Sequence, residues 1–171
     1  DTPLVMISGY GSQLVDWPKS FIDNLIKHKI RVIIFDNRDV GLSYKFSGKI
    51  IEDPKLIWRY SYSREKLPKE IKKPKIPYTL TNMAEDCINI LNALDIDKAH
   101  ILGTSMGGMI AQLVAFNFPK RCKSLISVMS TSGNPNLPRP SKKVIEGLNR
   151  QPASSNKKDV IENNLITRKL W

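Results

Sequence analysis

The fold of this chain is decided by the stretch HILGTSMGG, residues 100–108. Residues 100–102 form a short run that predicts a buried strand, and residues 106–117 predict a helix that stops ahead of a proline. Between them, Gly103 and Gly107 stand two residues before and two residues after a serine. This Gly-x-Ser-x-Gly spacing in a strand, turn and helix is typical of a nucleophile elbow, in which the glycines let strand and helix pass closely.

The serine of this pattern, Ser105, is the candidate catalytic residue. A strained turn would hold its hydroxyl out at the edge of the sheet, at the positive end of the following helix. The backbone N–H of Met106 would then be free to donate to an oxyanion. In a helix, Gly107 and Gly108 each cost up to about 1 kcal/mol relative to alanine, so we expect close backbone packing as the compensation.

The rest of the chain predicts alternating strands and helices. Helical periodicity begins after Asp16, a candidate N-cap, and again at Leu80, where Thr79 and Thr81 are both candidate caps. Strand–helix–strand repetition predicts an open α/β sheet with right-handed crossovers, in which ligands bind beyond the carboxyl ends of the strands. Continuous apolar runs, typical of parallel strands covered on both faces, occur at Leu4–Ile7, Arg31–Phe35, His100–Leu102 and Ser124–Met129.

Three motifs, taken together, resemble those of the α/β-hydrolase superfamily. They are Gly103–Gly108, Phe35–Ser43 after the second predicted strand, and Met6–Gly11 after the first. The run from residue 8 to residue 39 is further similar to the branch that contains the aclacinomycin methylesterases. The resemblance covers about residues 3–140.

The resemblance implies an α/β-hydrolase core, a mostly parallel sheet with helices on both faces, in which the predicted strands are the third to sixth of eight. It implies that Ser105 is the nucleophile and that the loop after the first strand gives a second oxyanion donor, the backbone N–H of Tyr10. It also implies that Arg38 ties loops together in a structural turn that includes Asp36 and Asp39. Such chemistry needs no cofactor and no metal, and the sequence has no phosphate loop, metal-ligand cluster or dinucleotide motif.

The base and the acid of a catalytic triad cannot be assigned in this sequence. In this fold both follow the serine in chain order, whereas the histidines, His28 and His100, precede it. Both are expected at the amino end of the sheet, His100 about 15 Å from the serine at about 3.3 Å per residue. The carboxylates after the serine, Glu146, Asp159 and Glu162, are not assigned as the acid. We therefore expect the triad acid and histidine to be missing from this chain.

The predicted domain organisation is incomplete. Residues 1–138 are expected to form the N-terminal part of the α/β-hydrolase core, with strands three to six and the nucleophile elbow. A proline-rich exit loop ends this part, and residues 139–171 are expected to begin a helical cap that is truncated in mid-element. The helical segments of this cap have apolar positions at Val144, Leu148, Val160, Ile161, Leu165 and Ile166.

The positive charge of the chain lies in two segments. The 171 residues have a net charge of +11, from 27 Lys and Arg against 16 Asp and Glu. Residues 45–75 hold ten basic and four acidic residues, residues 139–171 hold eight and three, and the remainder is neutral. We interpret both segments as lysine-rich solvated surface and predict no nucleic-acid partner. The alternative that stays open is a nucleic-acid site in which bases stack on Tyr60 and Tyr62.

The amino-acid composition also indicates the cellular compartment in which the protein is expected. No apolar run approaches the roughly 18 residues that span a bilayer, so no membrane segment is predicted. Cys87 and Cys122 have neither zinc-binding nor disulfide-scaffold spacing. We expect buried or half-buried free thiols in a reducing compartment, the cytoplasm.

The first predicted function is an esterase-like serine hydrolase (EC 3.1.1) that cleaves a small carboxylic ester through an acyl-enzyme, although this segment alone is expected to be inactive. Thioester, amide and C–C bond hydrolysis stay open. The alternative is a non-catalytic fragment or a ligand-binding α/β-hydrolase-like protein. The expected partner is a small-molecule ester, and the oligomeric state is not predicted. Trp58, Tyr60 and Tyr62, with Tyr10 and Trp17, either line a substrate site or, as we favour, pack under a loop.

Overall fold

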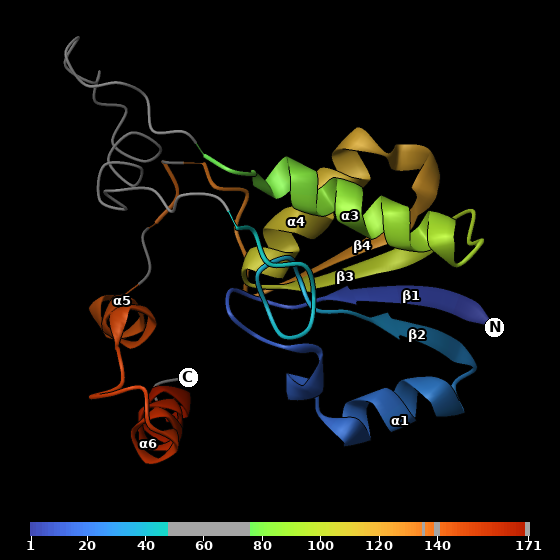
Figure 1. Cartoon of the computed structure of the whole chain (residues 1–171). Coiled ribbons are helices and arrows are strands. Elements are labelled where there is room, and N and C mark those ends of the chain that lie inside the picture. The colour runs from blue at the N-terminus through green and yellow to red at the C-terminus, as the bar shows by residue number, and fades with distance from the viewer. Residues whose placement is uncertain (48–75, 135, 139–140, 170–171) are drawn as a thin grey trace, which may run out of the picture. The chain divides into compact units, whose positions relative to one another are not determined.

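The computed structural model describes residues 1–47, 76–134, 136–138 and 141–169 (Figure 1). The chain divides into two compact units, Asp1–Pro135 and Asn136–Trp171. Trp58, Tyr60 and Tyr62, the aromatic side chains considered above for a substrate site, lie outside the described residues, as does most of the basic segment 45–75.

The first unit is built on a four-stranded parallel sheet. The four apolar runs form these strands, with bounds shifted by one or two residues from the prediction. β3 continues to Thr104, because Gly103 pairs with Ile7 and Thr104 pairs with Val128. Backbone pairing with both neighbours therefore decides where this strand ends. The strands are β1 (Thr2–Ile7), β2 (Ile30–Ile34), β3 (Ala99–Thr104) and β4 (Cys122–Val128), in the order β2-β1-β3-β4.

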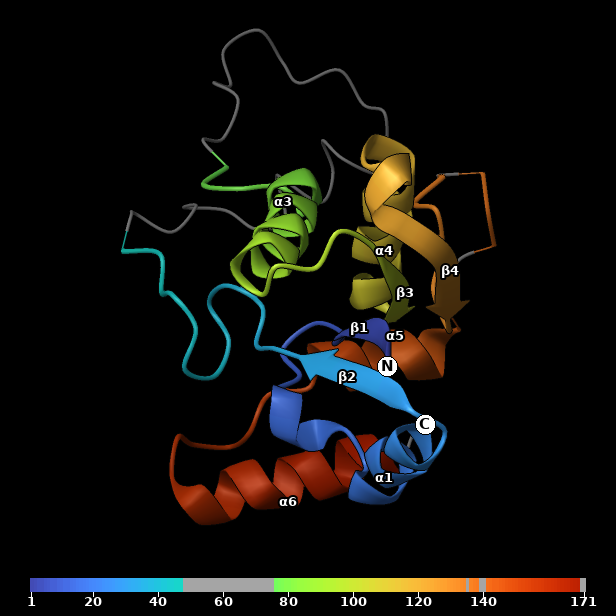
Figure 2. The same cartoon turned by 90° about the vertical axis from the view of Figure 1, so that its right-hand side faces the viewer.

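Helices cover both faces of this sheet (Figures 1 and 2). α1 (Lys19–Lys27) lies on one face, and α3 (Leu80–Ala93) and α4 (Met106–Asn117) lie on the other. Two short 3-10 helices, η1 (Leu14–Asp16) and η2 (Pro119–Arg121), precede α1 and follow α4. A parallel sheet between helical layers confirms the predicted fold class.

The cap of α1 differs from the prediction. Asp16 ends η1, where its carboxylate accepts the N–H of Gln13 at 2.9 Å, and Pro18 is the N-cap of α1. The predicted N-cap role of Asp16 is therefore wrong, because its carboxylate already closes the preceding turn. At α3, Thr79 is the N-cap, and its N–H donates to the side chain of Asn82 at 2.9 Å.

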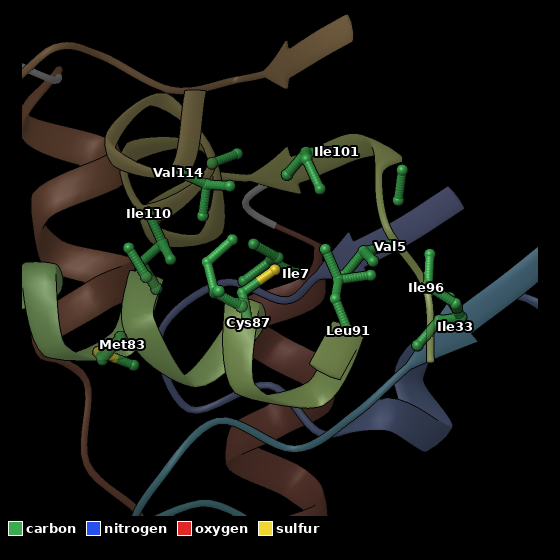
Figure 3. Packing of buried hydrophobic residues seen from close by; sticks show 14 residues of the cluster. Val5, Ile7, Ile33, Met83, Cys87, Leu91, Ile96, Ile101, Ile110 and Val114 are labelled. Carbon is green, nitrogen blue, oxygen red and sulfur yellow. The ribbon is translucent and has the colours of Figure 1, made fainter. Parts of the chain in front are cut away.

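The main hydrophobic core lies between the sheet and the pair α3 and α4 (Figure 3). Side chains of β1 alternate between this core and a second cluster on the α1 side of the sheet. Both faces of β1 are therefore buried, as predicted for a parallel strand. Val5 and Ile7 belong to the main core with Leu91 and Val114, and Leu4 and Met6 belong to the second cluster with Leu25 and Trp17.

β4 is an edge strand within the described part of the sheet, since it pairs with β3 on one side only. Its apolar side chains stay partly exposed, with Leu125 at 40%, Ile126 at 42% and Val128 at 37%. A continuous apolar run is typical of a strand that is covered on both faces. In the described residues, β4 is therefore covered less than its sequence predicts.

In the second unit, the described residues form helices α5 (Lys142–Asn149) and α6 (Lys157–Arg168). Ser141 and Asn156 are their N-caps, and each side-chain oxygen accepts a backbone N–H of the first turn. The segments predicted as helical after residue 138 are thus helices, while their assignment to a cap stays a prediction. No helix in the described ranges is long and apolar enough to cross a membrane.

Candidate active site

Ser105 lies between β3 and α4 and adopts a backbone conformation that is unusual for a serine. Its φ is 52° and its ψ is −120°, a region that costs a non-glycine residue about 1 to 3 kcal/mol. The end of β4 and the residues after it hold this conformation. The Ser105 N–H donates to the carbonyl of Val128 at 3.0 Å, and the Ser105 carbonyl accepts the hydroxyl of Ser130 at 2.7 Å. The turn therefore presents the Ser105 side chain at the exposed carboxyl edge of the sheet.

The glycines of the elbow are required by close backbone packing. A Cβ on Gly103 would lie 2.1 Å from the carbonyl oxygen of Gly107. A Cβ on Gly107 would lie 2.1 Å from the carbonyl oxygen of Ile7, and one on Gly108 would lie 2.5 Å from the Ser130 side chain. The expected close backbone packing is thus present at Gly103 and Gly107, whereas at Gly108 an added Cβ would meet a side chain.

The loop after β1, residues 8–13, passes beside the Ser105 side chain; we call it the β1 loop. A Cβ on Gly9 would lie 3.3 Å from the Cβ of Ser105 and 3.9 Å from its Oγ. The next residue, Tyr10, has a side chain that is 78% exposed. Within the described ranges, neither the Tyr10 amide nor the Met106 amide donates to an acceptor. Two unsatisfied N–H groups thus belong to the backbone segments that border Ser105, as an oxyanion site requires.

The turn after β2 holds the β1 loop through two adjacent side chains. Asp36 is buried, and its carboxylate accepts the N–H of Leu14 at 2.7 Å and that of Leu42 at 3.2 Å. Asn37 is buried as well, and its side-chain amide donates to the carbonyl of Ser8 at 3.1 Å. The role of Asp36 in this site is therefore structural, as the resemblance implies.

Arg38 joins the same turn to α3. Its Nε and Nη2 donate to the two carboxylate oxygens of Asp86 at 2.7 and 2.6 Å, and Nη2 also donates to the carbonyl of Asn82 at 3.3 Å. The guanidinium lies 4.9 Å from the centroid of the Tyr78 ring, which adds a cation–π contact. The hydrogen bond to Asp86 raises the pKa of Arg38, so this group stays charged.

Asp39 is also engaged structurally. Its carboxylate accepts the hydroxyl of Tyr78 and, at 2.6 Å, the N–H of Phe46. These bonds, that of Tyr78 first, lower the pKa of Asp39. Burial and the bond to Asp39 raise the pKa of Tyr78 to about 12. Both carboxylate oxygens of Asp39 are therefore bound by residues around this turn, Phe46 and Tyr78.

Neither histidine lies at the carboxyl edge of the sheet. His28 is the C-cap of α1, and its ring nitrogen donates to the carbonyl of Asn24 at 2.8 Å. His100 is the second residue of β3, five positions before Ser105, and its Nδ1 lies 2.6 Å from the hydroxyl of Ser124. Both histidines therefore belong to the amino end of the sheet, whereas Ser105 lies at its carboxyl edge.

Glu146, Asp159 and Glu162 belong to α5 and α6 of the second unit. Cys87 is a buried free thiol whose pKa burial raises to about 12, and Cys122 is a half-buried free thiol, as the sequence predicts. No group of three or more His, Cys, Asp and Glu side chains forms a possible metal site in the part of the chain that the structure describes.

Two supports of the elbow and its loop were not predicted. These are the hydroxyl of Ser130 on the Ser105 carbonyl and the amide of Asn37 on the Ser8 carbonyl. Both residues follow strands at the carboxyl edge of the sheet, and this position was the sequence signal that could have indicated their role. The direction of their side chains depends on tertiary packing and is not readable from spacing. Trp17, considered above for a substrate site, packs against the second hydrophobic cluster on the sheet, whereas Tyr10 is exposed and does not pack under a loop.

Comparison with known proteins places these features in a family. The family model described as alpha/beta hydrolase fold matches residues 2–159. Rhodomycin D methylesterase DauP of Streptomyces sp. (strain C5) is 29% identical over 125 residues, which cover 73% of this chain and 34% of the relative. The 2-hydroxy-6-oxononadienedioate/2-hydroxy-6-oxononatrienedioate hydrolase 1 of Pseudomonas putida is 37% identical over 76 residues, or 42% of this chain and 27% of the relative.

A solved structure agrees with this assignment at the level of the fold. A hydrolase from Pseudomonas aeruginosa PA01 superposes with a TM-score of 0.58 at 20% identity, over 99% of this chain and 57% of the other. The matched parts of the chain span 34% and 27% of the length of these two curated relatives. Because the family model covers residues 2–159 and the parallel sheet with its flanking helices agrees with this fold, the chain belongs to the α/β-hydrolase fold family.

Proposed function

We propose that this chain carries the nucleophile and the oxyanion donors of a serine hydrolase that cleaves a small carboxylic ester. The observation that carries the proposal is the strained, exposed Ser105, bordered by two backbone segments that each contain one amide, that of Tyr10 and that of Met106, without an acceptor in the described residues. Strained residues with such neighbours are typical of functional sites. The names of the relatives, a methylesterase foremost, support ester hydrolysis.

The proposed reaction proceeds through an acyl-enzyme. The Ser105 Oγ attacks the ester carbonyl carbon while a base accepts the hydroxyl proton, and a tetrahedral oxyanion forms. The amides of Tyr10 and Met106 donate to this oxyanion. The intermediate then expels the alcohol, which takes the proton from the base. Water, deprotonated by the same base, attacks the acyl group and releases the acid and the serine.

The base and its orienting acid are proposed to come from residues outside this sequence. His28 and His100 lie at the wrong end of the sheet and have other partners. The two relatives are about three and about four times as long as their matched segments, which leaves room for both groups. We therefore propose that the 171-residue chain alone is inactive and that the second unit is the start of a helical cap.

Ester hydrolysis is preferred over the other reactions of this fold because the methylesterase match covers 73% of the chain, against 42% for the match to the hydrolase from Pseudomonas putida. No cofactor is proposed. The two free thiols support a reducing compartment, for which we propose the cytoplasm.

Hydrolysis of short-chain nitrophenyl esters tests the proposal. We expect the chain ending at Trp171 to be inactive, and a form extended beyond Trp171 that bears a further histidine to hydrolyse the ester. Its Ser105→Ala variant, folded to the same extent by circular dichroism, should be inactive. An initial burst of nitrophenol equal to the enzyme concentration would support the acyl-enzyme. An inactive extended form would contradict the hydrolase and favour the ligand-binding alternative.

A further inference from the structure

We infer that Asp36 and Asn37 are positioning residues that hold the β1 loop in register with Ser105; this role rests on the proposed function. We call these two residues the loop clamp. They are adjacent in the turn after β2, and each binds the backbone of the β1 loop or of η1 directly after it. Neither residue is expected to contact the reacting atoms.

The loop clamp forms hydrogen bonds with the chain before and after Tyr10, whose amide is the proposed oxyanion donor. The side-chain amide of Asn37 donates to the carbonyl of Ser8, two residues before Tyr10. The carboxylate of Asp36 accepts the N–H of Leu14, four residues after Tyr10. Between these anchors the loop closes on itself, because the Ser12 N–H donates to the carbonyl of Gly9 at 3.3 Å. The two anchors and this turn together determine where the Tyr10 amide lies.

The Ser8 carbonyl links the loop clamp to the nucleophile elbow. A Cβ on Gly107 would lie 2.6 Å from the Ser8 oxygen, so this carbonyl packs against the first turn of α4 while it accepts from Asn37. The next residue, Gly9, packs against the Ser105 side chain. A shift of Ser8 would therefore move the β1 loop relative to the serine, and misplacement by about 1 Å can slow a reaction on the order of 100-fold.

The chemistry of the two anchors matches the groups they hold. Asp36 is only 8% exposed, and its carboxylate accepts two backbone N–H groups, which are charge-assisted bonds. Gly41 makes this approach feasible, because a Cβ there would lie 1.9 Å from Asp36 Oδ2. Asn37 supplies a donor, which a carboxylate cannot do, to a carbonyl. The order Asp-Asn is therefore specific, and the reverse order would place an acceptor against the Ser8 carbonyl.

The exchanged variant Asp36→Asn/Asn37→Asp tests this inference, because it keeps composition and net charge while reversing both anchors. Asn37→Leu, which replaces the side-chain amide by an apolar group with the same number of heavy atoms, is the second variant. Asp86→Asn is the matched control, since it makes the same chemical change at a carboxylate that binds Arg38 and not the β1 loop. Backbone ¹⁵N relaxation and amide exchange of residues 9–12 are measured in the chain ending at Trp171, without any need for activity.

We expect both loop-clamp variants to raise the mobility of residues 9–12 and to speed exchange of the Ser12 amide by about tenfold or more, while Asp86→Asn leaves both unchanged. In an extended form that reacts with a fluorophosphonate, the limiting labelling rate should fall about ten- to 100-fold in the loop-clamp variants, with the half-saturating concentration changed less than about twofold. If the two residues only stabilised the fold, the variants would lower the folded fraction, and the labelling rate of the folded molecules would stay unchanged.

The outcomes separate the two proposals. Loop mobility and labelling rates equal to those of the parent would overturn the loop clamp and leave the hydrolase proposal intact. A parent that never reacts at Ser105, with loop mobility raised in the variants, would contradict the hydrolase and support the structural part of the loop clamp. If Asn37→Leu does not fold, the exchanged variant and the mobility measurement decide.

Discussion

At the scale of single residues, Ser105 combines a strained backbone with an exposed hydroxyl, and its neighbours maintain the strain. The Ser105 N–H and carbonyl are both satisfied by the end of β4 and the residue after it. Gly107 is required on the other side, because the backbone of Ile7 and Ser8 occupies the space where its Cβ would lie. The strain at Ser105 is therefore supported by backbone packing from β1, α4 and β4.

Alanine at Gly107 should destabilise the fold more than alanine at Gly133. The Gly107→Ala Cβ meets the carbonyl oxygens of Ile7 at 2.1 Å and Ser8 at 2.6 Å, so we expect a loss of about 3 kcal/mol or more in the free energy of unfolding. Gly133 has a φ of +75° but open space around it, so Gly133→Ala should cost only the strain of about 1 kcal/mol. Urea unfolding followed by circular dichroism measures both, and equal losses would contradict the packing argument.

The buried thiol of Cys87 should make stability fall at alkaline pH. Burial raises its pKa from 9.0 to about 12, so above pH 9 the thiol ionises in the unfolded chain but not in the folded one. Stability is therefore complete below pH 9 and is lost toward pH 12, by up to about 1.4 kcal/mol per pH unit. Cys87→Ala should reduce this slope in urea unfolding between pH 9 and pH 11. Identical slopes in both proteins would contradict the assignment.

At the scale of elements, the turn after β2 connects three parts of the first unit. Asp36 and Asn37 bind the β1 loop and η1, Arg38 binds α3, and Asp39 binds Tyr78. Tyr78 directly precedes the N-cap of α3, so the turn and this helix are joined at two places. Through these hydrogen bonds, the turn fixes the β1 loop and α3 in position relative to β2.

Lysine at Arg38 should weaken the connection to α3. A lysine cannot reproduce the paired bonds to Asp86 together with the bond to Asn82, so Arg38→Lys should cost about 1 kcal/mol in the free energy of unfolding. Lys19→Ala removes an exposed ion pair with Asp23 within α1 and should cost about 0.5 kcal/mol or less. Thermal unfolding compares them, and a smaller cost for Arg38→Lys would count against this role of the turn.

Elements whose signals are local were predicted well from the sequence. The apolar residues of α4 end ahead of a proline, and the helix has the predicted bounds Met106–Asn117. Asp16 was misjudged because two turns compete for one carboxylate, and the ends of β3 depend on pairing with strands far away in sequence. The contacts of Asn37 and Ser130 depend on side-chain direction in the folded turn, which no spacing rule encodes.

At the scale of the whole molecule, the described sheet ends at β4, although the continuous apolar sequence of β4 is typical of a strand inside a sheet. Leu125, Ile126 and Val128 of β4 are continuous with an apolar run yet stay between 37% and 42% exposed. The family match reaches residue 159, and the segment matched to the methylesterase DauP covers 34% of that relative. These observations support the proposal that the base and acid of Ser105 come from residues outside this sequence.

The central claim is that Ser105 becomes a nucleophile when a base is supplied, and fluorophosphonate labelling followed by tandem mass spectrometry tests it directly. We predict a single adduct at Ser105 in a form extended beyond Trp171 that carries a further histidine. The chain ending at Trp171 and the extended Ser105→Ala variant should stay unmodified. An extended, folded form that remains unlabelled, or that is labelled at another residue, would contradict the account.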